Sequence, residues 1–179
     1  MALCTVYHTL GKDDDRNLIS LRESGLFPLF VNLQRGKVHD RISLEESIDS
    51  KADEFLPQAL RDKGFRRLKS VFATLHIPQT RERTVELIVD GEQGLVLPMD
   101  YYTSVRCSGN VADRYIRLYW SQALLLEEFL AQYEFNPDSA YGLYDLWQNR
   151  NGFVYFEPEV IFIPKAIKEF RRILLPSPN

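Results

Sequence analysis

The first 29 residues limit the possible folds most, because they place a strand, a turn and a helix in short succession. Residues 5–10 are β-branched and aromatic, which predicts a strand that carries the polar pair His8-Thr9 near its end. Residues 12–15 form a polar turn, and residues 16–24 have the apolar spacing of a short helix. Gly25 closes that helix, as glycine commonly does at a helix C-terminus. Residues 26–29 then return toward the core.

Strand and helix patterns continue along the rest of the chain. Strands are predicted at residues 29–33, 38–42, 70–77, 83–89, 93–97, 103–107 and 159–163. Helices are predicted at residues 43–52, 58–63, 112–133 and 141–148, and a short amphipathic helix or a helix-to-strand passage at 165–175. Asp90-Gly91 is the clearest turn signal, and it predicts a hairpin between the strands on either side.

These elements predict an α+β fold with a mixed, mostly antiparallel, split sheet that is flanked by helices. A length of 179 residues suits one domain with a sizeable core. We expect that single globular domain to span residues 1–175, with residues 176–179 as a loose tail.

The composition argues against several classes of protein. The net charge of −3 gives no global attraction to nucleic acid or to a membrane. The two cysteines, Cys4 and Cys107, make no disulfide framework, and with three histidines they show no zinc-ligand spacing, so no metal is expected. No signal-peptide pattern and no apolar run of membrane-spanning length is found. The sequence therefore predicts a cytoplasmic protein without a membrane partner.

Two stretches at opposite ends of the chain carry a resemblance to a known family. The first is Tyr7-His8-Thr9, which is followed by a short helix and Gly25-Leu26-Phe27-Pro28. The second is Glu159-Val160-Ile161-Phe162, a glutamate at the head of an apolar strand. Together they resemble the ADP-ribosyltransferases, above all the nucleic-acid-modifying toxins and the RNA 2′-phosphotransferases. In that family the first strand faces NAD, and a late strand begins with the catalytic glutamate.

The resemblance implies NAD as a substrate and gives roles to individual residues. Glu159 would be the catalytic carboxylate, which stabilises positive charge on the ribose as its bond to nicotinamide breaks and could also deprotonate the acceptor. His8, supported by Thr9 and Tyr7, would hydrogen-bond the ribose or the nicotinamide side of NAD. Phe72, in the stretch Val71-Phe72-Ala73-Thr74, would help to wall the nicotinamide pocket.

Some assignments stay open at this point. The pyrophosphate of NAD needs a cation, which could be Arg41 or an arginine of residues 61–67. Glu157 and Glu92 compete with Glu159 for the catalytic position. Glu157 lies two residues before Glu159 and would share its face in a strand, although Pro158 between them disfavours a regular strand. The acceptor, a nucleic acid or a protein, and the oligomeric state also stay open.

Two other functions fit the sequence. Arg61, Arg66, Arg67 and Lys69 form the densest basic run, which is either a solvated face or an edge that contacts the phosphates of a nucleic acid. The aromatic content of 12% without an unambiguous catalytic set also fits a non-catalytic interaction module. The discriminating observation is whether His8 and a carboxylate converge on one cleft.

Overall fold

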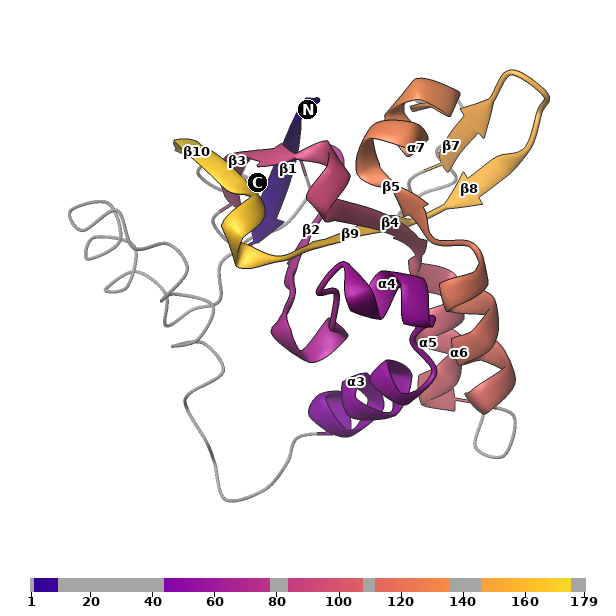
Figure 1. Ribbon diagram of the computed structural model, residues 1–179. Coiled ribbons are helices and arrows are strands. Elements are labelled where there is room, and N and C mark those ends of the chain that lie inside the picture. Colours follow the sequence, from indigo (N-terminus) through magenta and orange to yellow (C-terminus); the bar gives the residue numbers. More distant parts are fainter. Residues whose placement is uncertain (1, 10–43, 78–83, 108–111, 136–145, 175–179) are drawn as a thin grey trace, which may run out of the picture.

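The computed structural model describes residues 2–9, 44–77, 84–107, 112–135 and 146–174 (Figure 1). Within these ranges the chain forms five α-helices and ten strands, and every pairing between the strands is antiparallel. The predicted α+β class is therefore confirmed. Buried apolar side chains from the sheets and helices belong to one hydrophobic cluster, so these elements share a core.

Two sheets build the part of the fold that contains the candidate site. The first has the order β1-β3-β10, formed by Leu3–Thr9, Thr84–Asp90 and Ile167–Leu174. The second has the order β2-β9-β4-β5, formed by Val71–Ala73, Pro158–Phe162, Gly94–Pro98 and Leu124–Leu125.

A single bridge joins these two sheets between β1 and β2. The N–H of Tyr7 donates to the carbonyl of Thr74 at 2.9 Å, and the N–H of Thr74 donates to the carbonyl of Tyr7 at 2.8 Å. On either side of this pair β1 continues in one sheet and β2 in the other. The two sheets are therefore one series of strands that is split at the bridge.

Helices cover the second sheet. In Figure 1, α3 (Leu44–Glu54), α4 (Gln58–Asp62), α5 (Met99–Cys107) and α6 (Ala112–Ser121) lie on one side of β4 and β9. Trp120 of α6 donates a hydrogen bond from Nε1 to the carbonyl of Ala52 in α3 at 2.8 Å, which ties these two helices together. Short 3₁₀ turns connect other elements: η1 (Arg67–Lys69), η2 (Gly91–Gln93) and η5 (Pro164–Ala166).

A third, small sheet has the order β6-β7-β8 and lies beside α7 (Leu126–Gln132). Its strands are Tyr133–Phe135, Leu146–Asn149 and Val154–Phe156. Phe129 of α7 contacts the rings of Tyr133, Trp147 and Tyr155, with centroids 4.6, 5.4 and 5.1 Å away. An aromatic cluster therefore holds this sheet to α7.

The predicted hairpin around Asp90-Gly91 is wrong. β3 pairs with β1 and β10, whereas β4 pairs with β9 and β5, so the two strands belong to different sheets. The Asp90 carboxylate accepts from the backbone N–H of Glu92 at 3.2 Å and starts η2, which turns the chain into the second sheet. A Cβ at Gly91 would lie 2.9 Å from Sγ of Cys4, so only glycine lets this turn pack so closely on β1.

The predicted long helix at 112–133 is also wrong, because it is two helices with a strand between them. α6 ends at Ser121, Leu124 and Leu125 pair with Val96 and Leu95 of β4, and α7 begins at Leu126. The edge of β4 offers backbone hydrogen bonds that compete with those of a continuous helix. The apolar residues of 112–133 therefore belong to three short elements and not to one face of a single helix.

Other predictions divide between confirmed and wrong. The helices expected at 43–52 and 58–63 correspond to α3 and α4, and the passage at 165–175 corresponds to η5 followed by β10. Residues 103–107 were expected in a strand but lie in α5, and residues 146–148 were expected in a helix but lie in β7. The expected elements at 16–24, 29–33 and 38–42 lie outside the described residues.

Candidate functional site

A pocket of about 340 Å³ lies where β1 and β2 diverge. Three segments far apart in the sequence supply most of its wall: the end of β1, the strand β2 with the residue after it, and the start of β9. Met99, the first residue of α5, completes the wall. The lining residues are Tyr7, His8, Thr9, Phe72, Ala73, Thr74, Met99, Glu157, Pro158 and Glu159. The split between the sheets therefore creates a concave site with both polar and aromatic groups.

β1 contributes the histidine to this pocket. His8 alternates with Val6 and Cys4 on the buried face of the strand, so its imidazole is only 8% exposed. Its Nδ1 lies 2.6 Å from the carbonyl oxygen of Phe72 in β2. A carbonyl can only accept a hydrogen bond, so Nδ1 carries the proton in this contact. The contact fixes the plane of the ring across the split.

Two glutamates line the pocket at the start of β9. β9 begins at Pro158, which pairs with Pro98, so the proline does not prevent a strand but marks its first residue. Glu157, just before it, has a φ of 41° in the left-handed region, and its carbonyl accepts from the N–H of Met99 at 3.1 Å. This turn brings Glu157 and Glu159 to the same pocket, whereas Glu92 lies in η2 and is not part of the lining.

Behind the pocket, Glu159 is bound by a buried arginine. Arg67 donates from Nη1 to Oε2 of Glu159 at 2.5 Å and from Nη2 to Oε1 at 3.1 Å, a two-pronged contact. The hydroxyl of Tyr119 donates to Oε2 at 2.9 Å and accepts a hydrogen bond from Nη1 of Arg67. The Glu159 side chain is only 11% exposed, and the residue is part of the pocket lining.

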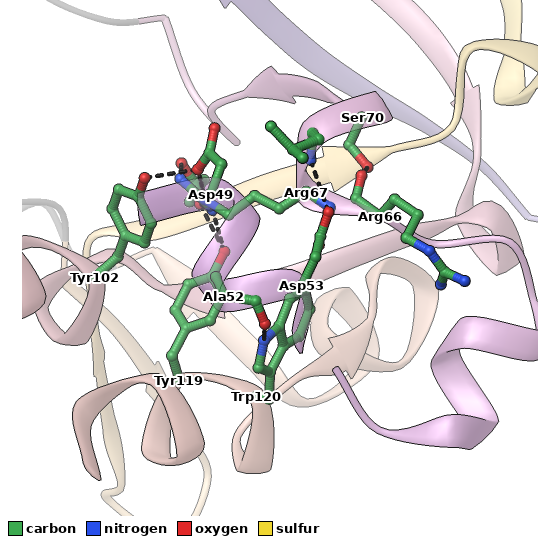
Figure 2. Close-up of polar contacts among 11 residues, drawn as sticks. Asp49, Ala52, Asp53, Arg66, Arg67, Ser70, Tyr102, Tyr119 and Trp120 are labelled. Carbon is green, nitrogen blue, oxygen red and sulfur yellow. Dashed lines mark hydrogen bonds and ion pairs between the residues drawn. The ribbon is translucent and has the colours of Figure 1, made fainter. Parts of the chain in front are cut away.

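Arg67 is itself held from its other side (Figure 2). Its Nε donates to Oδ1 of Asp49 in α3 at 2.5 Å, and the hydroxyl of Tyr102 in α5 donates to the same oxygen at 2.6 Å. The guanidinium carbon lies 3.6 Å from the ring centroid of Tyr102 and 4.7 Å from that of Phe72, within cation–π range. Three helices and two strands thus meet at one side chain.

The backbone near Arg67 is fixed by a second aspartate. The carboxylate of Asp53 accepts from the N–H groups of Arg67 at 2.6 Å and of Leu68 at 3.2 Å, which caps the turn η1. Ser70 adds a hydrogen bond from Oγ to the carbonyl of Arg66 at 2.7 Å. These contacts explain why the chain turns inward at Arg67, although Arg66 and Lys69 on either side are basic.

Burial and neighbouring charges together set the protonation states of Arg67, Tyr102 and Tyr119. Burial acts to lower the pKa of Arg67, but the carboxylates of Glu159 and Asp49 outweigh it and leave that pKa raised. Burial raises the pKa of Tyr102 to about 12, and burial together with the charge of Glu159 raises the pKa of Tyr119 well above its usual value. Arg67 is therefore charged and both tyrosines are neutral at physiological pH.

These raised tyrosine pKa values predict a loss of stability at alkaline pH. In the unfolded chain tyrosines ionise near pH 10, whereas Tyr102 and Tyr119 keep their protons to higher pH when folded. The stabilising contribution is complete below pH 10 and is lost as the pH rises through the folded-state pKa of about 12 for Tyr102. Urea unfolding at pH 9, 10 and 11 should show this fall, and it should be shallower in Tyr119→Phe. Equal slopes for both proteins would contradict the assignment.

The basic run predicted as a solvated or phosphate-contacting edge is divided in the structure. Arg67 is buried and paired, so it faces inward and does not belong to a surface edge. Arg61 donates to the carbonyl of Asp53 and Arg66 to that of Phe65, so both are partly engaged by the backbone. Lys69 is exposed. Arg41, the other cation considered for the pyrophosphate, lies outside the described residues.

The structure thus brings Tyr7, His8, Thr9, Phe72 and Glu159 to one pocket, together with the competing Glu157. The network behind Glu159 was not predicted. Arg67 lies 92 positions from Glu159. Asp49 and Tyr119 fall in predicted helices, and Tyr102 lies just before a predicted strand. One usable signal was the place of Arg67 between the apolar Phe65 and Leu68, which is unusual for a solvated face.

Other kinds of site find no support in the described part of the chain. It contains no group of three or more histidine, cysteine, aspartate or glutamate side chains placed to hold a metal ion. Among the helices that the structure describes, none has the length and hydropathy needed to cross a membrane. No protein-family model, curated protein or solved structure matches this chain, so the geometry of the pocket is the evidence for its function.

Proposed function

We propose that this protein uses NAD and transfers ADP-ribose to a nucleic acid or protein acceptor, in the manner of the ADP-ribosyltransferases. The observation that carries the proposal is the convergence of both ends of the chain on one pocket: Tyr7, His8 and Thr9 from β1 with Glu159 from β9. Sequence positions that are 151 residues apart (159 − 8) meet there. A non-catalytic surface has no need for this convergence of a histidine and a carboxylate in a cleft.

The size and lining of the pocket suit the nicotinamide–ribose end of NAD. Its volume of about 340 Å³ is at the lower end of the range for small-molecule sites. Phe72 and Tyr7 offer aromatic surface to a flat ring. His8, Thr9 and Thr74 offer polar groups to the amide and the ribose hydroxyls. The ADP portion would extend out of the pocket.

The carboxylate at the head of β9 supplies the charge that this reaction needs. The C–N bond between ribose and nicotinamide breaks, and its electron pair leaves with the nicotinamide. The ribose carbon becomes positively charged until an acceptor atom forms the new bond, and a carboxylate at the pocket takes the proton of the acceptor. A fixed negative charge close to the ribose lowers the energy of that transition state. Glu159 is held in place for this role before any ligand binds.

NAD binding is the first test, measured as thermal unfolding with and without NAD. At 100 times its dissociation constant, NAD should stabilise the wild type by about 2.7 kcal/mol. His8→Ala should reduce this shift strongly, because the imidazole lines the pocket. His76→Ala is the matched control, since this histidine is not part of the lining and should leave the shift unchanged. No shift in a folded wild type would overturn the proposal.

A second candidate is a protein that binds NAD without consuming it. The observation in its favour is that both oxygens of Glu159 already accept hydrogen bonds from Arg67 and Tyr119. Release of free nicotinamide from NAD by the wild type separates the two functions. If the protein binds NAD but releases no nicotinamide, with or without candidate acceptors, its function is to bind NAD without consuming it.

A further inference from the structure

The carboxylate of Glu159 is oriented by groups that do not line the pocket. We propose that Arg67 and Tyr119 are positioning residues, which fix the orientation of this carboxylate toward the ribose site. The effect of these residues on catalysis rests on the proposed function. Their effect on the orientation of the carboxylate does not depend on that function.

The contacts hold both oxygens of the carboxylate and the backbone of Glu159. The two prongs of Arg67 reach both oxygens and define the plane of the group, because a guanidinium and a carboxylate pair best when coplanar. Tyr119 adds a third donor on Oε2. The backbone of Glu159 is fixed in β9, where it pairs opposite Leu97 of β4. Rotation of the carboxylate would break at least one of these bonds in a buried setting.

The positioning residues are themselves immobilised. Arg67 is 3% exposed and is held by Asp49, while the N–H of its own backbone is bound by Asp53. Tyr119 is 1% exposed in α6, and its ring lies 5.0 Å from that of Trp120, which anchors α6 on α3. The orientation of one carboxylate thus depends on helices that are remote from the pocket.

The pairing does not remove the negative charge that the reaction requires. Arg67 carries one positive charge and faces two carboxylates, those of Asp49 and Glu159. The cluster of three groups therefore keeps a net charge of −1, and Glu159, which carries one of its two carboxylates, belongs to the pocket lining. If Arg67 faced Glu159 alone, the pair would be neutral and would stabilise a cation on the ribose far less.

The experiment compares two variants with a matched control in a nicotinamide-release assay. Tyr119→Phe removes one donor to Glu159, and Arg67→Lys keeps the charge but cannot form the two-pronged contact. Each should lower kcat about 10- to 100-fold and leave the KM for NAD within about 2-fold. Tyr155→Phe is the control, because its hydroxyl is also buried but donates to the carbonyls of Val96 and Gln122. It should leave kcat unchanged.

A purely structural role predicts a different pattern. Tyr119→Phe and Tyr155→Phe would then lower the melting temperature alike, and kcat at a temperature where both are folded would stay at the wild-type value. That result would overturn the inference. A rise in KM with unchanged kcat would also overturn it, because it would assign Arg67 and Tyr119 to NAD binding.

Crystal structures of the wild type and of Tyr119→Phe give a readout that does not require activity. We expect the carboxylate of Glu159 to rotate, or to occupy more than one orientation, in the variant. If the wild type neither binds nor cleaves NAD, the proposed function fails, and this comparison still decides the geometric inference. An identical carboxylate orientation in both structures would overturn it.

Discussion

Replacing Arg67 with methionine is expected to lower the free energy of unfolding by about 3–5 kcal/mol. The substitution leaves the carboxylates of Asp49 and Glu159 without their shared cation in an interior where their side chains are only 14% and 11% exposed. It also removes the donor that links them and the cation that stacks on Tyr102. Urea unfolding monitored by the fluorescence of the two tryptophans would measure the loss.

The adjacent arginine provides the matched control for this change. Arg66 carries the same charge but donates to the backbone carbonyl of Phe65 and is partly exposed, so Arg66→Met should cost less than about 1 kcal/mol. The double variant Arg67→Met/Glu159→Gln should be more stable than Arg67→Met alone, because glutamine removes one unpaired charge. A loss below about 1 kcal/mol in Arg67→Met would show that the ion pairs contribute little.

The largest expected effect on activity is that of Glu159→Gln. Glutamine keeps the shape of the side chain but removes the negative charge at the ribose, so nicotinamide release should fall by about 10²–10³-fold. NAD binding, measured by the thermal shift, should stay close to that of the wild type, because the charge acts mainly in the transition state. The assay should be made at a temperature where the variant is fully folded.

Two other glutamates make this experiment selective. Glu92→Gln is a surface control, since Glu92 is exposed in η2 outside the pocket and should have no effect. Glu157→Gln tests the competing carboxylate in the same pocket. A larger loss for Glu157→Gln than for Glu159→Gln would move the catalytic role to Glu157. Equal activity in both variants and the wild type would contradict a role for either residue.

The strands that carry the pocket residues could be predicted from the sequence, because these residues occur in local patterns. Tyr7-His8-Thr9 ends a clear strand, and Glu159 heads another, so each position is specified by its neighbours in the chain. The network behind Glu159 could not be predicted, because it depends on the meeting of four elements. Arg67 and Asp49 are 18 positions apart, and Arg67 and Tyr119 are 52 apart, with no pattern that connects them.

The wrong predictions of the fold also come from contacts between segments that are distant in the sequence. Asp90-Gly91 does form a tight turn, but the choice of partner strands is made by the sheets on each side, and β3 and β4 are buried along their whole lengths in different sheets. Apolar periodicity could not show the break at Leu124 and Leu125, since these residues are apolar in either structure. Local signals indicated which segments are regular, and tertiary pairing decided how they are combined.

The bridge between Tyr7 and Thr74 has a mechanical consequence. Across the described length of this seam, only two backbone hydrogen bonds join the sheets, whereas β1 and β3 are paired over seven consecutive positions. Changing the angle between the sheets therefore strains far fewer bonds than shearing either sheet internally. We therefore expect a ligand that enters between β1 and β9 to be accommodated by a small change in the angle between the sheets, with the pairing inside each sheet kept.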